Sequence, residues 1–311
     1  MIKADAYGHG AAVLAAASEN LVDGFAVAEI GEAAELVAAG ITKPIHILAS
    51  SEPATAQISA RANNIVPSVC DLREIRILKQ YASGIIKNVN LKINTGMNRL
   101  GVAPDEVVKA ATQIRRAGFK INGVFSHLYN AADEYSANRQ LRIFQSCTAF
   151  LSKDIKRHIA ASSCMGLSKN FYLDAVRPGL ALYSSVLKVR APILKIFRVK
   201  KGGHISYGDY SAPRDMLIAA IRAGYADGVR RKPFPNQEDR FVSVNGVLCP
   251  IVGQVCMDIL LADVTKAQIS YAACAYVLGE GITAQMLADA CGTNVYEILT
   301  SFKGRIERKY I

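Results

Sequence analysis

Three consecutive segments decide the fold class: NLKIN (residues 90–94), PDEVVKAATQIRRA (residues 104–117) and GVFSH (residues 123–127). The first and third are short apolar runs, which are typical of strands, and the second is a longer amphipathic run, which is typical of a helix. The helical run begins with two acidic residues (105–106) and ends with two arginines (115–116), which suits the helix dipole. Strand, helix and strand in this order form the repeating unit of a parallel α/β sheet.

The same alternation extends over the first 183 residues. Eight strand candidates occur, at residues 1–3, 25–29, 44–49, 65–69, 90–94, 123–127, 158–162 and 176–183. Helix-like runs lie between them, including residues 31–39, 72–81, 104–117 and 137–156. Eight strands that are each followed by a helix favour a (β/α)8 TIM barrel over the alternative, an open doubly wound sheet.

The pattern changes after Tyr183. Short strand-and-turn runs without long helical periods occur at residues 189–199, 204–207, 216–221, 241–247, 250–255 and 275–278. We therefore expect two domains, an α/β barrel over residues 1–190 and a C-terminal all-β domain over residues 191–311.

The composition is typical of a soluble globular protein, because 51% of the 311 residues are hydrophobic and 20% are charged. Lysine and arginine number 37 against 26 acidic residues, which gives a formal net charge of +11. Such a charge can indicate nucleic acid, a membrane surface or an anionic ligand as partner. The basic clusters at residues 200–201, 230–232 and 303–309 contain neither a nucleic-acid-binding motif nor interleaved aromatic residues. This favours a solvated basic face, and we expect no nucleic-acid partner.

The seven cysteines are odd in number, widely spaced and free of CxxC or Cys/His pairs. They predict reduced thiols in a cytoplasmic protein and no metal site. No stretch approaches 18 consecutive apolar residues, so we expect no membrane span. Residues 1–18 loosely resemble a signal peptide, but Asp5 and the glycine-containing turn at residues 8–10 interrupt the apolar run.

Barrel enzymes build their sites at the C-terminal ends of the strands. The reactive residues near these ends are Lys3, Lys92, Arg99, His127, Ser162, and Arg177 with Gly179. Lys3 is followed by small, flexible residues that let the backbone approach a ligand closely. A lysine in a barrel mouth can form a Schiff base, because desolvation and nearby cations lower its pKa. From the residues alone, a surface lysine whose charged end reaches water remains the alternative.

The segment KADAYGHG (residues 3–10) resembles the pyridoxal-phosphate attachment segment of alanine racemases. This fold-type III family of isomerases pairs an N-terminal barrel with a C-terminal β domain. Further ordered matches are LKINTGMNRLG (91–101), FSHL (125–128), VRPGLALY (176–183), ISYGDY (205–210), AGYADGVRR (223–231), GQVCMDIL (253–260) and YEIL (296–299). The resemblance therefore covers the whole chain.

The resemblance implies that Lys3 carries pyridoxal phosphate and that Lys3 and Tyr207 are the two acid/base groups. Racemisation removes a proton from one face of the α-carbon and returns it to the other, while the cofactor ring accepts the negative charge. Two groups on opposite faces therefore suit the reaction. Tyr207 would need nearby positive charge or hydrogen-bond donors, because a free tyrosine is a poor base.

The resemblance also assigns the contacts of the cofactor and the substrate. The phosphate is assigned to Tyr7, Ser162, Gly179, Leu180 and Tyr296, the pyridine nitrogen to Arg177, and the ring face to His127. Arg177 does not readily give up a proton, so the ring nitrogen would stay unprotonated, and a weaker electron sink limits side reactions. The substrate carboxylate is assigned to Arg99 and the backbone of Met257, and the substrate entrance to Tyr225 and Asp258. Lys92 matches a lysine that is carbamylated in some relatives.

In the family, the tyrosine base and the Met-Asp segment come from a second subunit. The resemblance therefore implies a homodimer with shared active sites, in which Tyr207, Tyr225 and Met257 act on Lys3 of the other chain. It also implies a role in supplying D-alanine for peptidoglycan.

Several departures from the family pattern leave alternatives open. Met1 lies two residues before Lys3, whereas relatives have a helix and most of the first strand ahead of it. We therefore expect a truncated first strand, and either the true start lies upstream or the chain is compromised. Ala161, Asn94 and Gln254 stand where the family usually has Asn, Asp and Arg. The alternatives are a barrel that holds pyridoxal phosphate with little turnover, a broad-specificity racemase, or a basic amino-acid decarboxylase. Arg177 argues against the decarboxylase, which usually sets an acidic residue against the ring nitrogen.

Overall fold

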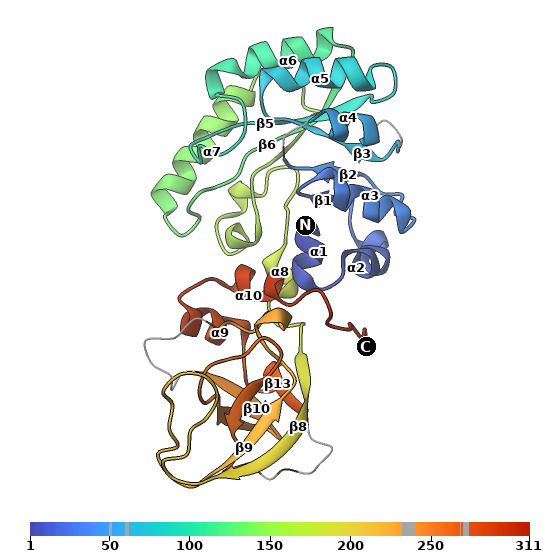
Figure 1. Ribbon diagram of the computed structural model, residues 1–311. Helices are drawn as coiled ribbons and strands as arrows, with labels where there is room; N and C mark the ends of the chain where they lie inside the picture. Colours follow the sequence, from blue (N-terminus) through green and yellow to red (C-terminus); the bar gives the residue numbers. More distant parts are fainter. Residues whose placement is uncertain (50–51, 60–61, 232–239, 268, 270–273) are drawn as a thin grey trace. The chain divides into compact units, whose positions relative to one another are not determined.

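The computed structural model describes residues 1–311 except 50–51, 60–61, 232–239, 268 and 270–273. The chain forms two compact units, Met1–Ala181 (unit 1) and Leu182–Ile311 (unit 2). Each unit is described by itself (Figure 1).

Unit 1 contains parallel strands in two consecutive sheets. The strands are β1 (Phe25–Val27), β2 (Ile45–Ile47), β3 (Ile65–Val66), β4 (Ser68–Val69), β5 (Asn88–Lys92), β6 (Lys120–Phe125) and β7 (Lys156–His158). Their spatial order is β1-β2-β3 and then β4-β5-β6-β7, which is also their order along the chain. Pro67 divides the run between β3 and β4, because proline has no N–H group to donate to a neighbouring strand.

Hydrogen bonds from two short segments close the ring between β7 and β1. Ala161 forms a parallel bridge with Arg177. The amino group of Met1 then donates to the Pro178 carbonyl at 2.9 Å, and the Ile2 N–H donates to the Ala26 carbonyl at 2.9 Å. The predicted barrel is therefore confirmed, with residues 1–2 and 177–178 completing it beside β1 and β7.

The strand predicted at residues 158–162 lies earlier, as β7, with only an isolated bridge at Ala161, and two others of the eight are absent. Residues 1–3 do not form a strand, because Lys3 already begins the helical turn α1 (Lys3–Gly8). Residues 176–183 also do not form a strand. Pro178 cannot donate to a neighbour, and the chain turns into the short helix α8 (Leu180–Tyr183).

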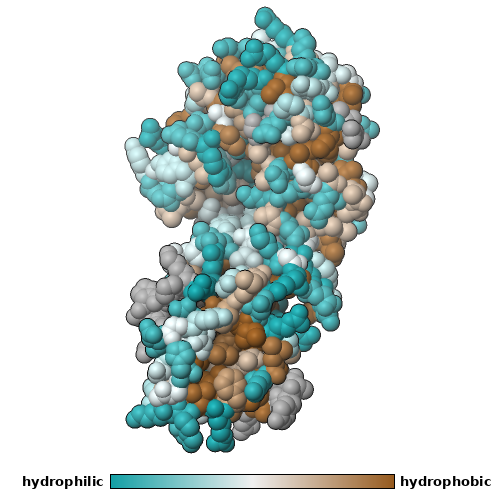
Figure 2. Space-filling view, in the orientation of Figure 1, coloured by the Kyte–Doolittle hydropathy of each residue, from teal (hydrophilic) through white to brown (hydrophobic). Residues whose placement is uncertain are grey.

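The helices of unit 1 follow the strands. They are α2 (Ala11–Ser18), α3 (Ile30–Ala38), α4 (Pro53–Ser59), α5 (Leu72–Ala82), α6 (Val107–Arg116) and α7 (Glu134–Thr148), with short 3-10 turns η1 (Glu19–Leu21), η2 (Pro104–Glu106), η3 (Ser162–Cys164) and η4 (Lys169–Phe171). Helix α6 buries Val107, Ala110, Ala111 and Ile114, a helical spacing that places one apolar face on the core. Hydrophilic residues predominate over the region of α5, α6 and α7 on the face drawn in Figure 2.

The helix predicted over residues 137–156 ends earlier, at Thr148. The Arg157 guanidinium donates to the carbonyl groups of Thr148 at 3.1 Å and Leu151 at 2.9 Å. These bonds satisfy carbonyl groups that the end of the helix leaves without partners. The chain can therefore leave the helix and enter β7.

Unit 2 is built on a six-stranded antiparallel sheet. Its strands are β8 (Val189–Val199), β9 (Met216–Ile221), β10 (Phe241–Val244), β11 (Val247–Pro250), β12 (Leu260–Asp263) and β13 (Cys274–Leu278), in the order β11-β10-β13-β8-β9-β12. Figure 2 shows hydrophobic residues gathered over this unit on the face drawn. The predicted strands at 189–199 and 216–221 have the observed bounds. β12 was not predicted.

Other predictions for unit 2 need correction. Residues 204–207 form only an isolated bridge at His204, because Ser206 has a positive φ of 64°. The strand predicted at residues 250–255 is also not formed: β11 ends at Pro250, Ile251 adds only an isolated bridge to Ala262, and Gly253 has a φ of 66°. The unit also contains the turn η5 (Tyr225–Asp227) and the helices α9 (Ala284–Cys291) and α10 (Val295–Ser301). The expected β domain is therefore confirmed as an antiparallel sheet, and α9 and α10 are additions to it that the sequence did not predict.

Candidate active site

The turn that follows Lys3 has an unusual backbone. Ala4, Asp5, Ala6 and Tyr7 all have φ between 51° and 56°, so α1 is a left-handed turn of non-glycine residues. Left-handed helical conformation costs an L-residue roughly 1–2 kcal/mol. Tertiary and local hydrogen bonds hold the turn: the Asp5 carboxylate accepts from the Ala11 N–H at 2.7 Å, and the Asp5 carbonyl accepts from the Gly10 N–H at 2.9 Å. Strained backbone of this kind is common at functional sites.

Lys3 belongs to a group of cationic side chains in unit 1. Burial lowers the pKa of Lys3 and Arg99 lowers it further, whereas Glu32 raises it. The pKa of Lys92 is also lowered, mainly by burial, with Arg99, Arg177 and Lys3 adding to the effect. These mutual effects place Lys3, Lys92 and Arg99 in one electrostatic neighbourhood, where an amine loses its proton more easily than in water.

His127 lies in the same neighbourhood. Burial lowers its pKa to about 4, and Arg177, Arg99 and Lys3 contribute in the same direction. The ring is therefore neutral at pH 7. A neutral aromatic ring can stack on a flat ligand, which is compatible with the contact that the family resemblance assigns to it.

Arg177 is buried, with 8% of its surface exposed, at the end of the barrel strands. Its guanidinium donates to the Ser126 carbonyl at 2.7 Å and the Ile159 carbonyl at 3.2 Å, and it also contacts Nδ1 of His158. Burial lowers the pKa of Arg177 to about 10, so the group keeps its charge at neutral pH. Its carbonyl partners fix the guanidinium in one orientation, which suits recognition of a single ligand atom.

His158 was not among the predicted site residues. Burial lowers its pKa well below 6.5, with Arg177 adding to the effect, so the ring is neutral and Nδ1 can accept from the guanidinium. The ring also stacks on Phe125 with a centroid distance of 5.2 Å. The sequence contains no local signal for this role, because His158 and Arg177 meet only through the barrel.

Tyr7, Ser162 and Gly179 converge as the resemblance implies. The Ser162 hydroxyl accepts from the Gly179 N–H at 2.7 Å and from the Ala181 N–H at 3.2 Å. A Cβ atom on Gly179 would lie 2.5 Å from the Tyr7 hydroxyl oxygen, so only glycine leaves room for this side chain. The Tyr7 and Ser162 hydroxyl groups thus both lie next to the Gly179 backbone, and hydroxyl and N–H groups of this kind are suitable ligands for a phosphate group. Leu180 lies between the two N–H groups and begins α8.

A second group of predicted site residues lies on unit 2. Tyr207, Tyr225, Met257 and Tyr296 are all at least 40% exposed. The Tyr225 N–H donates to the Cys256 carbonyl at 3.1 Å, and the Ala226 N–H donates to the Met257 carbonyl at 3.1 Å. The motifs around Tyr225 and Met257, which are about 30 residues apart in sequence, therefore form one surface.

Tyr207 lies on a neighbouring segment. The Ser206 hydroxyl donates to the Gln254 carbonyl at 2.7 Å, and a Cβ atom on Gly253 would lie 2.6 Å from the Ile205 carbonyl oxygen. These contacts join the segment that carries Tyr207 to the segment that leads to Met257. Three of the predicted site residues on unit 2 are thus presented by segments in direct contact.

Asp258 is engaged in an ion pair that the sequence did not predict. The Arg305 guanidinium binds the Asp258 carboxylate at 2.6 Å and the Asp227 carboxylate at 2.7 Å. Both carboxylates raise the pKa of Arg305. Arg305 therefore fastens the motif of Tyr225 to the motif of Met257.

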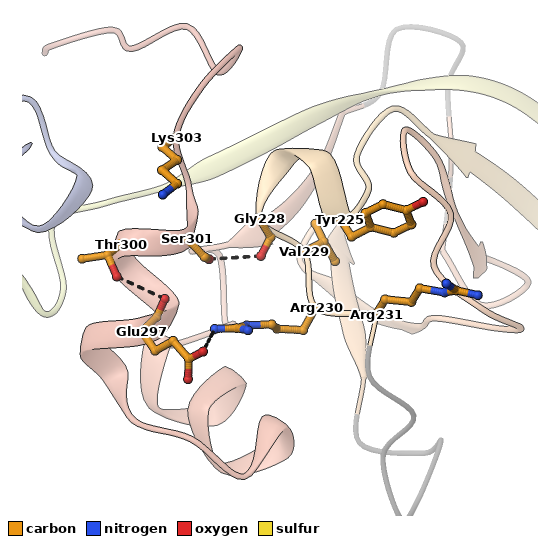
Figure 3. A pocket seen from close by; sticks show the side chains of 9 residues that line it. All are labelled: Tyr225, Gly228, Val229, Arg230, Arg231, Glu297, Thr300, Ser301 and Lys303. Atoms are coloured by element: carbon orange, nitrogen blue, oxygen red, sulfur yellow. Dashed lines mark hydrogen bonds and ion pairs between the residues drawn. The ribbon is translucent and has the colours of Figure 1, made fainter. Parts of the chain in front are cut away.

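A pocket of about 470 Å³ lies beside Tyr225 in unit 2 (Figure 3). It is lined by Tyr225, Gly228, Val229, Arg230, Arg231, Glu297, Thr300, Ser301 and Lys303. Arg230 reaches across it to pair with Glu297, and the Ser301 hydroxyl donates to the Gly228 carbonyl at 3.0 Å. Figure 3 shows Tyr225 and Arg231 on the side away from α10, and the Arg231 guanidinium lies 5.8 Å from the centre of the Tyr225 ring.

Other site types find no support in the part of the chain that the structure describes. Within it, no group of three or more His, Cys, Asp or Glu residues could hold a metal ion. No helix among the described residues is both long and apolar enough to cross a membrane. All seven cysteines are free thiols.

Comparison with known proteins covers both units. The family model of the N-terminal domain of alanine racemase matches residues 1–186, and that of the C-terminal domain matches residues 186–310. The alanine racemase of Thermodesulfovibrio yellowstonii is 38% identical over 331 residues, which cover 100% of this chain and 89% of that protein.

Solved structures agree with this result. The crystal structure of alanine racemase from E. faecalis has a TM-score of 0.91 and 28% identity, and the match covers 100% of this chain and 90% of that chain. The crystal structure of alanine racemase from Bartonella henselae with covalently bound pyridoxal phosphate has a TM-score of 0.86 and 28% identity, with coverage of 100% and 91%. The chain belongs to the alanine racemase family.

Proposed function

We propose that this protein interconverts L-alanine and D-alanine with pyridoxal phosphate attached to Lys3. The observation that carries the proposal is the meeting of two features at one end of the barrel. Lys3, whose pKa is lowered by burial and by Arg99, begins the turn that contains Tyr7, and the Tyr7 hydroxyl lies against Gly179, whose N–H donates to Ser162. An amine that is easily deprotonated and a set of phosphate donors together suit this cofactor.

The residues of unit 1 would hold the cofactor in one orientation. Tyr7, Ser162 and the backbone of Gly179 and Leu180 would bind the phosphate. Arg177 would donate to the pyridine nitrogen, and His127 would stack on the ring. When bound, pyridoxal phosphate withdraws electrons from the α-carbon of an amino acid. Arg177 keeps its own proton, because its pKa of about 10 is far above that of a pyridine nitrogen, and this limits side reactions.

Proton transfer at the α-carbon would be divided between two residues. Lys3 would hold or take the proton on one face, since burial and Arg99 favour its neutral amine. Tyr207 would serve the other face. It is 68% exposed on unit 2, as a side chain that acts on a second molecule needs to be.

We propose that the active enzyme is a homodimer in which Tyr207, Tyr225 and Met257 serve Lys3 of the partner chain, as the family resemblance implies. Arg99 and the Met257 backbone would bind the substrate carboxylate, Asp258 would lie at the substrate entrance, and Tyr296 would add a contact to the phosphate. The seven free thiols suit a cytoplasmic enzyme. Its product would supply D-alanine for peptidoglycan.

The test is exchange of the α-proton of L-alanine and D-alanine in deuterium oxide by the full chain with pyridoxal phosphate. We expect both enantiomers to exchange and to interconvert. Lys3→Ala should abolish covalent attachment of the cofactor. Tyr207→Phe should retain the cofactor and slow the direction that starts from L-alanine, whereas the matched variant Tyr210→Phe, three residues further along, should behave as the wild type.

Three outcomes would contradict the proposal or a part of it. Cofactor attachment at Lys3 without exchange of either enantiomer would favour a barrel that only holds pyridoxal phosphate. Exchange of several amino acids at rates similar to alanine would favour a broad-specificity racemase. Equal slowing of both directions by Tyr207→Phe would refute the assignment of this residue to one face.

A further inference from the structure

Glu32 makes an unusual set of contacts for a glutamate in the first turn of a helix. It lies in α3, and its Oε2 atom accepts from the backbone N–H groups of Ala28 at 2.6 Å and Glu29 at 3.3 Å, as expected for a capping residue. Its Oε1 atom accepts from the Ala4 N–H at 2.5 Å. Ala4 directly follows Lys3, whereas Ala28 directly follows β1. One carboxylate therefore links the start of α1 to the end of β1.

The link falls on a strained stretch of backbone. Ala4 is the first of four non-glycine residues with left-handed dihedrals. Such residues keep this conformation only when their surroundings enforce it. Hydrogen bonds from backbone N–H groups to a carboxylate are stronger than those to a neutral acceptor, so Glu32 is well suited to hold the turn.

The charge of Glu32 also acts on Lys3. The groups that face Lys3 or interact with it electrostatically are Arg99, Lys92, His127 and Glu32. Burial and Arg99 lower the pKa of Lys3, and Glu32 raises it. Glu32 thus opposes a set of cations that would otherwise repel the protonated lysine.

We propose that Glu32 is a positioning residue for Lys3: its carboxylate ties the peptide after Lys3 to the end of β1 and sets a negative charge beside the cofactor lysine. The proposal rests on the proposed function, because it concerns the lysine that would carry pyridoxal phosphate. Glu32 does not touch the reacting atoms in this scheme. It fixes the position and the protonation of the residue that does.

Glu32→Gln separates the two parts of the role from simple capping. The side chain keeps its length, but it loses the charge and replaces one acceptor oxygen with an NH2 group, which cannot accept from a backbone N–H. Glu32→Asp keeps the charge but is one methylene shorter, so it cannot reach both Ala4 and Ala28. Glu35→Gln is the matched control, because Glu35 lies one turn further along α3 with its side chain exposed.

The experiment uses the full chain and pyridoxal phosphate. Cofactor affinity and the pH dependence of attachment are followed by visible absorbance, and borohydride trapping with mass spectrometry identifies Lys3. For Glu32→Gln we expect about tenfold weaker cofactor binding, the loss equivalent to one charge-assisted hydrogen bond. We also expect the midpoint of attachment to move to lower pH, because attachment requires the neutral amine of Lys3. Glu32→Asp should weaken binding with a midpoint near that of the wild type, and Glu35→Gln should change neither quantity.

The outcomes distinguish this proposal from the proposed function. If the wild type itself is not trapped at Lys3, the proposed function fails. If the wild type is trapped and Glu32→Gln gives the same affinity and midpoint, only the role of Glu32 is refuted. A lower thermal stability with an unchanged midpoint also refutes it, because that result shows capping alone. Should Glu32→Gln fail to fold, Glu32→Asp decides: wild-type affinity in that variant overturns the proposal.

Discussion

Gly179→Ala gives a direct test of the phosphate site proposed at Tyr7, Ser162 and Gly179. A Cβ atom at this position would lie 2.5 Å from the Tyr7 hydroxyl oxygen, 3.0 Å from Cζ of the same ring and 3.3 Å from the Met1 Cβ atom. Gly179 is not among the residues with positive φ, so alanine is compatible with its backbone conformation. The effect of the substitution is therefore steric and falls on Tyr7.

The size of the effect follows from these distances. Tyr7 has to withdraw by roughly 1 Å to restore ordinary van der Waals contact, which is enough to break a hydrogen bond. A hydrogen bond to a charged group contributes about 1.5–3 kcal/mol. We therefore expect Gly179→Ala to bind pyridoxal phosphate about 10 to 100 times more weakly than the wild type.

The assay is titration of the full chain with pyridoxal phosphate, followed by visible absorbance. Gly166→Ala is the control, because a Cβ atom there would meet nothing within 4 Å. A cycle with Tyr7→Phe adds a second test. The phenylalanine ring lacks the hydroxyl group that clashes and donates, so Gly179→Ala should cost much less affinity in the Tyr7→Phe background.

Two results would refute this reasoning. If Gly179→Ala bound the cofactor as tightly as Gly166→Ala, Tyr7 would not be needed for the phosphate or would move without cost. If the losses from Gly179→Ala and Tyr7→Phe added in full, the two residues would act independently, contrary to the contact between them.

Two further predictions concern other parts of the molecule. Arg305→Gln should raise the KM for alanine several-fold in steady-state assays, because the motifs of Tyr225 and Met257 lose their common partner. Its free energy of unfolding should change by about 1 kcal/mol or less, since the Arg305 side chain is half exposed; a KM equal to that of the control Lys309→Gln would count against this role. The second prediction concerns the wild type, whose free energy of unfolding should fall as the pH drops from 6.5 to about 4. Burial lowers the pKa values of His46 and His127 to about 4, so the unfolded chain binds more protons in this range. Urea unfolding at pH 7 and pH 5 measures the change, His46→Gln should reduce it, and equal stability at both pH values would contradict the assignment.

The fold could be predicted where local pattern and tertiary structure agree. β8 and β9 have the predicted bounds, and the run at residues 104–117 becomes η2 and α6, because its apolar residues recur on one face that the barrel buries. The missed helices of unit 2 had signals in the sequence. Thr283 caps α9 through the Met286 N–H, and Asn294 caps α10 through the Glu297 N–H. Such capping residues are recognisable before a helical run. The strand-like runs that precede them in the C-terminal half nevertheless favoured an all-β domain.

The eighth strand shows a different kind of error. Residues 176–183 include Val176, Leu180, Leu182 and Tyr183, which resemble a buried strand in composition. The proline and glycine at residues 178–179 were the contrary signal. They end the extended segment after one bridge residue and set the backbone N–H groups of 179 and 181 on Ser162. The departure from a regular strand thus brings these N–H groups to the Ser162 hydroxyl, where we propose that the phosphate binds.

The candidate site was predictable only in part, because motif matching finds residues that resemble those of relatives. His158, Glu32 and Arg305 were missed for a physical reason. Each acts through a partner distant in the sequence, such as Arg177 for His158 or Asp227 for Arg305, and nothing local distinguishes it from an ordinary core histidine or surface charge.

The left-handed turn at Ala4–Tyr7 was harder still to predict, because the backbone preferences of its own residues oppose it. Alanine is a favourable residue in right-handed helices and a poor one at positive φ. The turn exists because contacts from outside, including the Glu32 carboxylate on Ala4 and the packing of Tyr7 against Gly179, outweigh that preference. A right-handed turn of the same length would send residue 7 in a different direction from the Ser162 hydroxyl. Predictions from residue preferences should therefore fail where a functional site requires a particular backbone geometry. The strained turn after Lys3 is such a place.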